Sequence, residues 1–266
     1  MITIKIGGSV VDGLHSTFVS ELSQLHKNGI IIVHGGGKEV SHVCSQMGIE
    51  PKFVTSPSGI RSRYTDAETM SVFEMVMAGR INQNIVRMLQ KNGISAVGLA
   101  GADARIIEAT RKKRLLKTNE KGRPQAIDGG YTGKITSVNH TFLDKIIQEG
   151  MVPVISPVAI SEEFESLNVD GDRAAANVAG ATGSDSVVFI TDVDGLYMND
   201  KLVQSLALQE ARDIRTSVGP GMEKKILAST EALQMGVGRA IIACGQRNNP
   251  ITRALSHDEC TVISDG

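Results

Sequence analysis

The sequence has little of several features that mark particular classes of protein. Its formal net charge is only −1 over 266 residues, so no overall electric field attracts nucleic acid or a membrane surface. Its three cysteines lack the spacing of a metal site and are too few for a disulfide framework. No apolar run reaches the roughly 18 residues of a membrane span, and no signal-peptide pattern precedes the first predicted strand. We therefore predict a cytoplasmic protein with free thiols, no dedicated metal cage and no nucleic-acid or membrane partner.

What the sequence does have is a regular alternation of short apolar runs and amphipathic patterns. With 41% hydrophobic residues the chain can bury a large core. Residues 1–6 read as a buried strand that ends at Gly7-Gly8-Ser9, and residues 30–33 as another that ends at His34-Gly35-Gly36-Gly37. Such repeated units predict an α/β protein with a mostly parallel sheet, whose ligands lie at the carboxyl ends of the strands.

The remaining elements follow the same logic. Helical patterns cover residues 16–28, 38–47, 67–89, 143–148, 173–181 and 219–235, and further buried strands cover residues 96–100, 152–155, 187–190, 240–243 and 261–263. Residues 53–65 read as polar and irregular, whereas residues 105–139 carry hairpin punctuation and predict an antiparallel β-hairpin flap. A shift in composition near residue 170 predicts two lobes that share one sheet, residues 1–170 and residues 171–266.

Lys5 is the anomaly of the first strand. A lysine is almost never fully buried unless it has a partner, so this one is either an exposed residue of an edge strand or one wall of an anion site. Glycine turns at the ends of parallel strands favour anions, because free N–H groups point at the ligand there. The chain has two such turns near its N-terminus and a third at Gly219-Pro-Gly221, so together they favour phosphoryl-group chemistry.

Two aspartate-containing loops are further candidates. In Asn168-Val-Asp170-Gly-Asp172 the polar side chains alternate; a helix N-cap explains one aspartate but not Asn168 as well, and the loop is too short for an EF-hand. A carboxylate that orients a lysine at a phosphate site fits better. In Thr191-Asp192-Val-Asp194-Gly195 the aspartates either contact a nucleotide or form a turn. His34 stands beside glycines without a paired acid and reads as structural.

These motifs occur in the order seen in the amino acid kinase family, and the chain most resembles its N-acetylglutamate kinase branch. They are Ile4-Lys5-Ile-Gly7-Gly8-Ser9, Val33-His34-Gly-Gly-Gly37, Asn168-Val-Asp-Gly-Asp172, Thr191-Asp-Val-Asp-Gly195 and Gly221-Met-Glu-Lys-Lys225. The resemblance spans essentially the whole chain. It implies a three-layer α/β/α sandwich with a mostly parallel central sheet, in which residues 1–170 hold the acceptor and residues 171–266 hold ATP, accompanied by Mg²⁺.

The resemblance also implies a role for each motif. Lys5 and Lys225 would flank the transferring phosphoryl group, and Asp172 would hold both lysines in place. The N–H groups of Gly8 and Gly36 would bind the moving oxygens. The residues of the acceptor clamp would be Gly36, Gly37, Arg63 and Asn168, and those of the nucleotide side would be Asp192, Gly195, Gly221 and Met222. No catalytic base is required, because a carboxylate acceptor is already ionised at neutral pH.

The acceptor loop departs from the acetylglutamate kinases. It reads Gly59-Ile-Arg61-Ser-Arg63-Tyr-Thr-Asp66 where they typically carry Gly-Leu-Arg-Val-Thr-Asp, so Arg61 and Arg63 compete for the clamp; Arg63 keeps the spacing to Asp66. This longer loop is similar to that of the LysW-aminoadipate kinases, which act on 2-aminoadipate or glutamate blocked by an acidic carrier protein. Those relatives imply a carrier partner and a homodimer.

A dense basic cluster in the predicted flap bears on the same choice. Its members are Arg111, Lys112, Lys113, Arg114, Lys117, Lys121 and Arg123. They are either a solvated edge that lysines protect from aggregation or a docking surface for an acidic partner. Carrier-linked aminoadipate or glutamate is the leading acceptor in our interpretation. The alternatives are free N-acetylglutamate as the acceptor, or a non-catalytic amino-acid sensor on the same fold.

Overall fold

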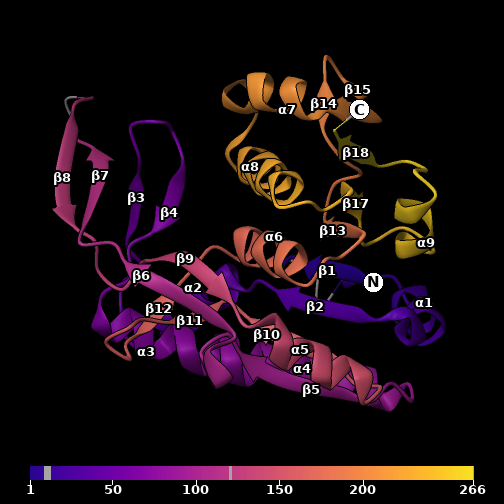
Figure 1. The fold of residues 1–266 in the computed structure, drawn as a ribbon. Helices are drawn as coiled ribbons and strands as arrows, with labels where there is room; N and C mark the ends of the chain where they lie inside the picture. Colours follow the sequence, from indigo (N-terminus) through magenta and orange to yellow (C-terminus); the bar gives the residue numbers. More distant parts are fainter. Residues whose placement is uncertain (9–12, 120–121, 266) are drawn as a thin grey trace.

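The computed structural model describes residues 1–8, 13–119 and 122–265. Ser9 of the first glycine turn and Lys121 of the basic cluster lie outside the described residues. An eight-stranded sheet forms the middle of the molecule (Figure 1). Its strands in spatial order are β16 (Ser205–Ala207), β18 (Thr261–Ser264), β17 (Arg239–Cys244), β13 (Ser186–Thr191), β1 (Ile2–Ile6), β2 (Ile30–His34), β10 (Val152–Ser156) and β5 (Ala96–Ala100).

The sheet is mostly parallel, as the sequence predicted. The only antiparallel pairing among its described strands is that of β17 with β18, and β16 runs parallel to β18. β1 lies in the middle, between β13 and β2, with Lys5 opposite Phe189 and Val33. Lys5 therefore belongs to a central strand, so the edge-strand reading of this lysine is wrong.

Helices cover both faces of the sheet. Alternate residues of β2 separate the two sides: Ile30 and Ile32 pack into one core cluster, and Ile31 and Val33 into the other. The first cluster lies under α1 (Thr17–Leu25), α2 (Gly37–Gln46), α3 (Ala67–Glu74), η3 (Met75–Ile81), α4 (Asn82–Lys91) and α9 (Pro250–Leu255). The second lies under α5 (His140–Gln148), α6 (Gly171–Ala181), α7 (Leu208–Ile214) and α8 (Pro220–Gln234). This is the three-layer α/β/α sandwich.

The long helical pattern after residue 66 is continuous but not uniform. Asp66 caps it, accepting a hydrogen bond from the Thr69 N–H at 3.0 Å. Its middle part, η3, is a π-helix. The wider turn matters for the site, because it carries Met77 and Ile81, which pack against Gly36.

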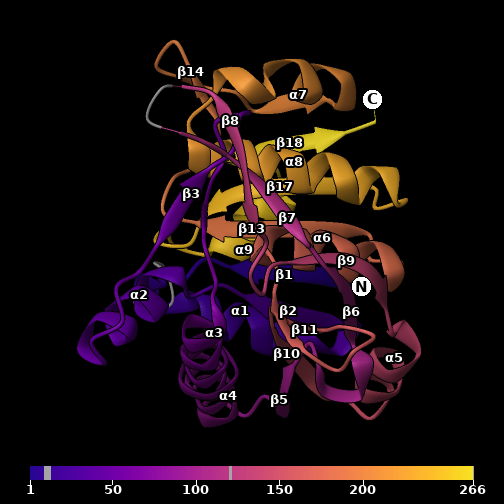
Figure 2. The same cartoon turned by 90° about the vertical axis from the view of Figure 1, so that its left-hand side faces the viewer.

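A second, four-stranded sheet and two hairpins complete the fold. The sheet has the order β12 (Ser166–Asn168), β11 (Val158–Ile160), β6 (Ile107–Arg111) and β9 (Gly133–Val138). The hairpins are β3 (Phe53–Thr55) with β4 (Arg61–Arg63), and β7 (Arg114–Thr118) with β8 (Pro124–Asp128); they stand side by side on one flank (Figures 1 and 2). The short remaining elements are η2 (His26–Asn28), η4 (Asp103–Arg105), η5 (Arg215–Ser217) and the pair β14 (Tyr197–Met198) and β15 (Lys201–Leu202).

Two sequence-based expectations need correction here. Residues 53–65 are not irregular, since they contain the β3–β4 hairpin. None of its strand side chains is fully buried, so no apolar alternation revealed it. The flap is smaller than predicted: only β7 and β8 project, whereas β6 and β9 belong to the second sheet. Within the described residues, no helix combines the length and apolar character that crossing a lipid bilayer requires.

Candidate active site

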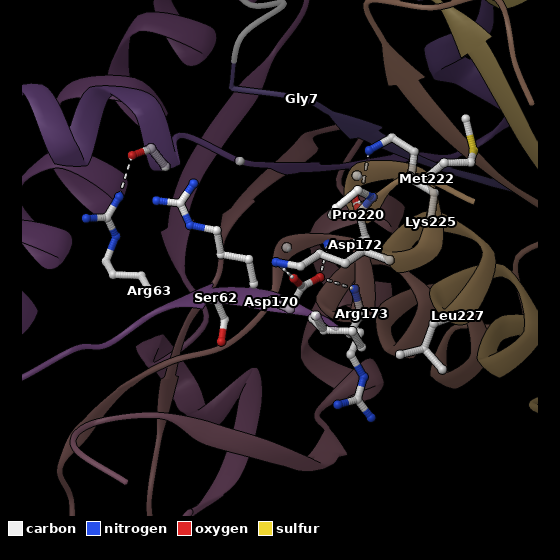
Figure 3. A pocket seen from close by; sticks show the side chains of 18 of the residues that line it. Gly7, Ser62, Arg63, Asp170, Asp172, Arg173, Pro220, Met222, Lys225 and Leu227 are labelled. Carbon is white, nitrogen blue, oxygen red and sulfur yellow. Dashed lines mark hydrogen bonds and ion pairs between the residues drawn. The ribbon is translucent and has the colours of Figure 1, made fainter. Parts of the chain in front are cut away.

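An open cleft of about 1430 Å³ runs along the carboxyl ends of β1, β2 and β13. It is lined by the glycine turns after β1 and β2, by the N-terminal ends of α6 and α8, and by both hairpins. In Figure 3, Arg63 lies on one side of this cleft and Met222 and Lys225 lie on the other, with Asp172 between them. Strands that run parallel bring their turns to one edge of the sheet, which is why these distant segments meet.

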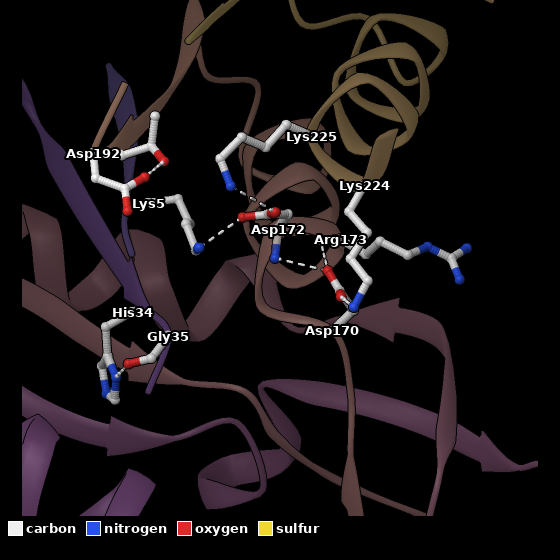
Figure 4. A network of polar contacts seen from close by, with 10 residues as sticks. Lys5, His34, Gly35, Asp170, Asp172, Arg173, Asp192, Lys224 and Lys225 are labelled. Carbon is white, nitrogen blue, oxygen red and sulfur yellow. Dashed lines mark hydrogen bonds and ion pairs between the residues drawn. The ribbon is translucent and has the colours of Figure 1, made fainter. Parts of the chain in front are cut away.

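Asp172 holds two buried lysines in the centre of the cleft (Figure 4). Its Oδ1 lies 2.7 Å from Nζ of Lys5, and its Oδ2 lies 3.3 Å from Nζ of Lys225. The side chains of Lys5, Asp172 and Lys225 are only 9%, 8% and 13% exposed, respectively. Side-chain alternation in β1 directs Lys5 to the face that α6 covers, and Asp172 stands in the first turn of α6. The triad carries a net charge of +1.

The charges of this triad control its titration. Burial alone would raise the pKa of the Asp172 carboxyl, but the charges of Lys5 and Lys225 and their hydrogen bonds outweigh it and lower the pKa to about 2. Burial lowers the pKa of Lys225, and the Asp172 carboxylate opposes that change. Asp172 is therefore ionised at neutral pH, and it screens two ammonium groups that would otherwise repel each other.

Asp170 explains why Asp172 is free for this task. Asp170 is the N-cap of α6 and accepts hydrogen bonds from the N–H groups of Asp172 and Arg173, at 3.0 and 3.2 Å. Its other oxygen lies 3.5 Å from Nζ of Lys224. One aspartate thus caps the helix and the other binds the lysines, which resolves the choice that the sequence left open.

Gly8 and Gly36 bring two backbone turns into direct contact. A Cβ on Gly8 would lie 2.4 Å from both the Cα and the N of Gly36, and a Cβ on Gly36 would lie 2.1 Å from Cδ1 of Ile81. Neither position has room for a side chain. Lys5 is close to the same turn, because a Cβ on Gly35 would lie 3.5 Å from its Nζ. Free backbone N–H groups beside a lysine make a cradle for an anion.

Arg63 lies on the side of the cleft opposite Lys225. Its Nη2 donates to the carbonyl oxygen of Gly37 at 2.6 Å and to Oγ of Ser41 at 2.7 Å. Its Nη1 is buried and has no hydrogen-bond partner in the described parts of the chain. Arg61 and Arg63 both lie over the ring of Phe53, 4.4 and 5.0 Å from its centre. The remaining N–H groups of Arg63 could still bind a carboxylate.

The other predicted residues also line the cleft. Asn168 donates through Nδ2 to Oγ1 of Thr65 at 2.8 Å, and it reaches the cleft beside Asp170. On the opposite side, the predicted nucleotide residues are all lining residues: Asp192, Gly195, Gly221 and Met222. A Cβ on Gly195 would lie 2.3 Å from Oγ1 of Thr261, so this glycine is required by packing.

His34 has a structural role. Its ring is buried between Gly35, whose carbonyl oxygen lies 3.2 Å from Nδ1, and Asn82, whose Nδ2 lies 3.2 Å from Nε2. Burial, only partly offset by the hydrogen bond to Gly35, lowers the pKa of His34 to about 4. The ring is thus neutral at pH 7 and fixed by its neighbours, as the sequence indicated.

The amino-acid sequence is similar to those of known proteins along most of its length. The model of the amino acid kinase family matches residues 1–244. The chain belongs to the amino acid kinase family. A protein of Metallosphaera sedula named LysW-aminoadipate/LysW-glutamate kinase is 43% identical over 96% of this chain and 97% of its own length. The same activity is provisionally assigned to a protein of Nitrosopumilus maritimus that is 67% identical over 99% of both chains.

Solved structures agree on the fold of this amino acid kinase. The protein smu.665 of Streptococcus mutans superposes with a TM-score of 0.80 at 20% identity, covering 100% of this chain and 98% of its own. An isopentenyl phosphate kinase superposes with a TM-score of 0.66 at 20% identity, covering 99% and 100%. At these identities the likeness establishes the shared architecture alone.

The sequence left Asp194 open between a nucleotide contact and a turn, and the structure shows it paired with other side chains. Asp194 does not reach for a ligand, because both of its oxygens accept hydrogen bonds from Arg247, at 2.8 and 2.9 Å, and Tyr197 donates to it at 2.9 Å. Arg247 thereby ties the loop after β13 to the loop after β17. Lys112 and Lys224 also line the cleft. Nothing in the sequence assigns a role to Arg247 or Lys224, since their partners Asp194 and Asp170 lie far away in the chain.

Proposed function

We propose that this kinase transfers a phosphoryl group from ATP to the side-chain carboxylate of 2-aminoadipate or glutamate whose amino group is linked to an acidic carrier protein of the LysW type. The product is an acyl phosphate. The observation that carries the proposal is the buried triad in which Asp172 holds Lys5 and Lys225 in the cleft. The names of the full-length relatives in Metallosphaera sedula and Nitrosopumilus maritimus support this choice of acceptor.

In this reaction the protein would chiefly position the reactants and offset the negative charge of the phosphoryl group. Negative charge spreads over the oxygens of the phosphoryl group as it moves, and two ammonium groups held by one carboxylate are suited to stabilise it. The N–H groups of Gly8 and Gly36 would add hydrogen bonds at the same place. The acceptor carboxylate is ionised at neutral pH and attacks without a base.

The two sides of the cleft would divide the substrates. We assign the acceptor to residues 1–170, where Arg63 and Asn168 would hold its α-carboxylate and Gly37 would support it. We assign ATP to residues 171–266, along the Thr191–Gly195 loop and the start of α8. Mg²⁺ would arrive with ATP and take most of its ligands from phosphates and water, since no group of three or more His, Cys, Asp or Glu in the described residues is arranged to hold a metal ion.

The carrier would dock on the hairpins. In the described part of the β7–β8 hairpin, β7 carries Arg114 and Lys117, and Arg123 precedes β8. The adjacent β3–β4 hairpin adds Arg61. An acidic carrier is attracted to such a surface by charge. The same proposal includes a cytoplasmic homodimer that acts in lysine biosynthesis, and in arginine biosynthesis when glutamate is the acceptor.

The deciding experiment compares acceptors. ADP release is measured with carrier-linked aminoadipate, carrier-linked glutamate and free N-acetylglutamate. We expect the carrier-linked acceptors to give the higher kcat/KM, and their KM to rise with salt because exposed charges are screened over about 8 to 10 Å at physiological ionic strength. Efficient turnover of free N-acetylglutamate with no advantage from the carrier would make this chain an N-acetylglutamate kinase instead.

A second measurement separates an enzyme from a sensor. Lys5→Ala and Lys225→Ala should abolish ATP consumption while the protein stays folded, as circular dichroism would show. If wild-type protein binds the acceptor but consumes no ATP with any of the three, the chain is an amino-acid sensor and the proposed function is wrong.

A further inference from the structure

Lys112 is a cation of the cleft that the proposed chemistry leaves unused. It follows β6 at the root of the β7–β8 hairpin and lines the cleft. The backbone of Lys112 is fixed from two directions. The N–H of Lys112 donates to the carbonyl oxygen of Thr132 at 2.9 Å. A Cβ on Gly129 would lie 1.5 Å from the carbonyl oxygen of Lys112, so the two segments are in direct contact. This crossing of two chain segments holds the start of the side chain in one place.

The ammonium group of Lys112 has no counter-ion among the residues that the structure describes. It forms no hydrogen bond and no ion pair within 4 Å in the parts of the chain that the structure describes. Burial, followed by the charges of Arg173 and Lys134, lowers the pKa of Lys112, against the opposing charge of Asp170. Asp170 already pairs with Lys224 at 3.5 Å. A half-buried cation in net positive surroundings gains most from an anion that arrives with a ligand.

The neighbours of Lys112 show which substrate would bring that anion. Thr132 accepts the hydrogen bond from the Lys112 N–H and pairs on its other side with Asn168. Lys112 and Asn168 are therefore two strand spacings apart, roughly 10 Å between backbones. Arg63 and Asn168 account for the α-carboxylate of the acceptor, and Lys5 and Lys225 for the phosphoryl group. Lys112 lines the same cleft and is joined to Asn168 through Thr132.

We propose that Lys112 binds a second carboxylate of the acceptor, carried by the acyl group that blocks its amino nitrogen. An acetyl group has no such charge, whereas the acidic end of a carrier peptide has. This inference rests on the proposed function, because it requires an acylated amino acid as the acceptor. It makes Lys112 a residue that distinguishes acidic acyl groups from neutral ones.

The test uses two small acceptors of nearly equal size that differ in this charge, N-butanoylglutamate and N-succinylglutamate. Wild-type protein should have a KM roughly 10-fold lower for the succinyl compound, because a charge-assisted hydrogen bond gives about that factor. Lys112→Met keeps the apolar stem and should raise the KM for the succinyl compound until the preference is lost, and Lys112→Arg should restore part of it. Lys113→Met removes the same charge one residue along, where the side chain is exposed and does not line the cleft, and should retain the preference.

The outcomes separate this inference from the proposed function. Equal KM values for the two acceptors in wild-type protein, or a preference that survives in Lys112→Met, would overturn the role of Lys112 while the carrier-linked acceptor is still phosphorylated. If only the carrier-linked acceptor reacts, its KM must rise more in Lys112→Met than in Lys113→Met, and equal effects would again overturn the role. No phosphorylation of any acceptor would defeat the proposed function itself.

Discussion

Replacing Asp172 with Asn tests the centre of the site, because it removes one negative charge and almost no volume. In the wild-type protein the carboxylate lies 2.7 Å from Lys5 and 3.3 Å from Lys225. In Asp172→Asn the two ammonium groups would face each other with no anion between them, in a place that water scarcely reaches. We expect both lysines to move apart, and stability and catalysis to fall together.

The magnitude follows from the pKa. The carboxyl of Asp172 titrates at about 2 instead of its usual 3.8. That difference corresponds to roughly 2.5 kcal/mol of stability at pH 7, or a fall in Tm of about 5 to 10 °C for a chain of this size. A lowered pKa stabilises the folded state above pH 3.8, and this contribution is lost as the pH falls towards 2. About 1 kcal/mol of the deficit of the variant should therefore disappear at pH 3.

The assay combines urea unfolding at pH 7 and pH 3 with ADP release at pH 7. We expect kcat to fall roughly 100- to 1000-fold, the usual loss when charge stabilisation of a transition state is removed. Glu231→Gln is the matched control. Glu231 also joins α6 to α8, through two hydrogen bonds from Arg173 at 2.8 and 2.7 Å, but it does not touch the lysines. The Glu231→Gln substitution should lower the free energy of unfolding by about 1 kcal/mol and change kcat by less than about threefold.

One result would refute this reasoning. If Asp172→Asn folds and keeps kcat within about threefold of wild type, Asp172 does not hold the lysines for catalysis. A loss of kcat as large in Glu231→Gln would show instead that any weakening of the α6–α8 contact inactivates the protein.

Three further perturbations have defined outcomes. Gly8→Ala should destabilise the protein by about 1 to 3 kcal/mol and lower kcat at least 10-fold, because the new Cβ would lie 2.4 Å from the backbone of Gly36; urea unfolding and ADP release measure both. Arg247→Ala should raise the KM for ATP several-fold with little change in kcat, because it frees Asp194 and the loop beside the nucleotide side of the cleft. His34 stays neutral in the folded protein down to about pH 4, whereas it titrates near 6.5 when unfolded. The stability of the wild-type protein should therefore fall by roughly 3 kcal/mol as the pH drops from 6.5 to 4. His34→Gln should lack this part of the acid dependence in urea unfolding.

Each of these has a control or a contrary result. Gly79→Ala should be tolerated, because nothing lies within 4 Å of the added Cβ. A fall in kcat at unchanged KM for ATP in Arg247→Ala would contradict its role in placing the nucleotide loop. An acid dependence in His34→Gln that equals the wild-type curve would show that other groups cause it.

Much of the fold is legible in the sequence because it is local. Strands buried on both faces appear as uninterrupted apolar runs, the glycines that end them appear as turns, and the cap at Asp66 precedes a helical pattern. The parallel sheet and the position of a site at its edge follow from these signals. The β3–β4 hairpin gave no such signal, because its strands are short and none of their side chains is fully buried.

The site itself is only partly legible. Sequence motifs, read through a family resemblance, named Lys5, Asp172 and Lys225, but their distances depend on how α6 and α8 pack over the end of β1. The hydrogen bonds of Arg63 to Gly37 and Ser41 join two elements, β4 and α2, so the sequence does not show them. The run of cations around Lys112 is uniform in the sequence, and only the crossing at Gly129 and Thr132 turns one of them towards the cleft. Charge and periodicity are properties of neighbours along the chain, whereas the direction of a side chain and its counter-ion depend on segments that the fold brings together.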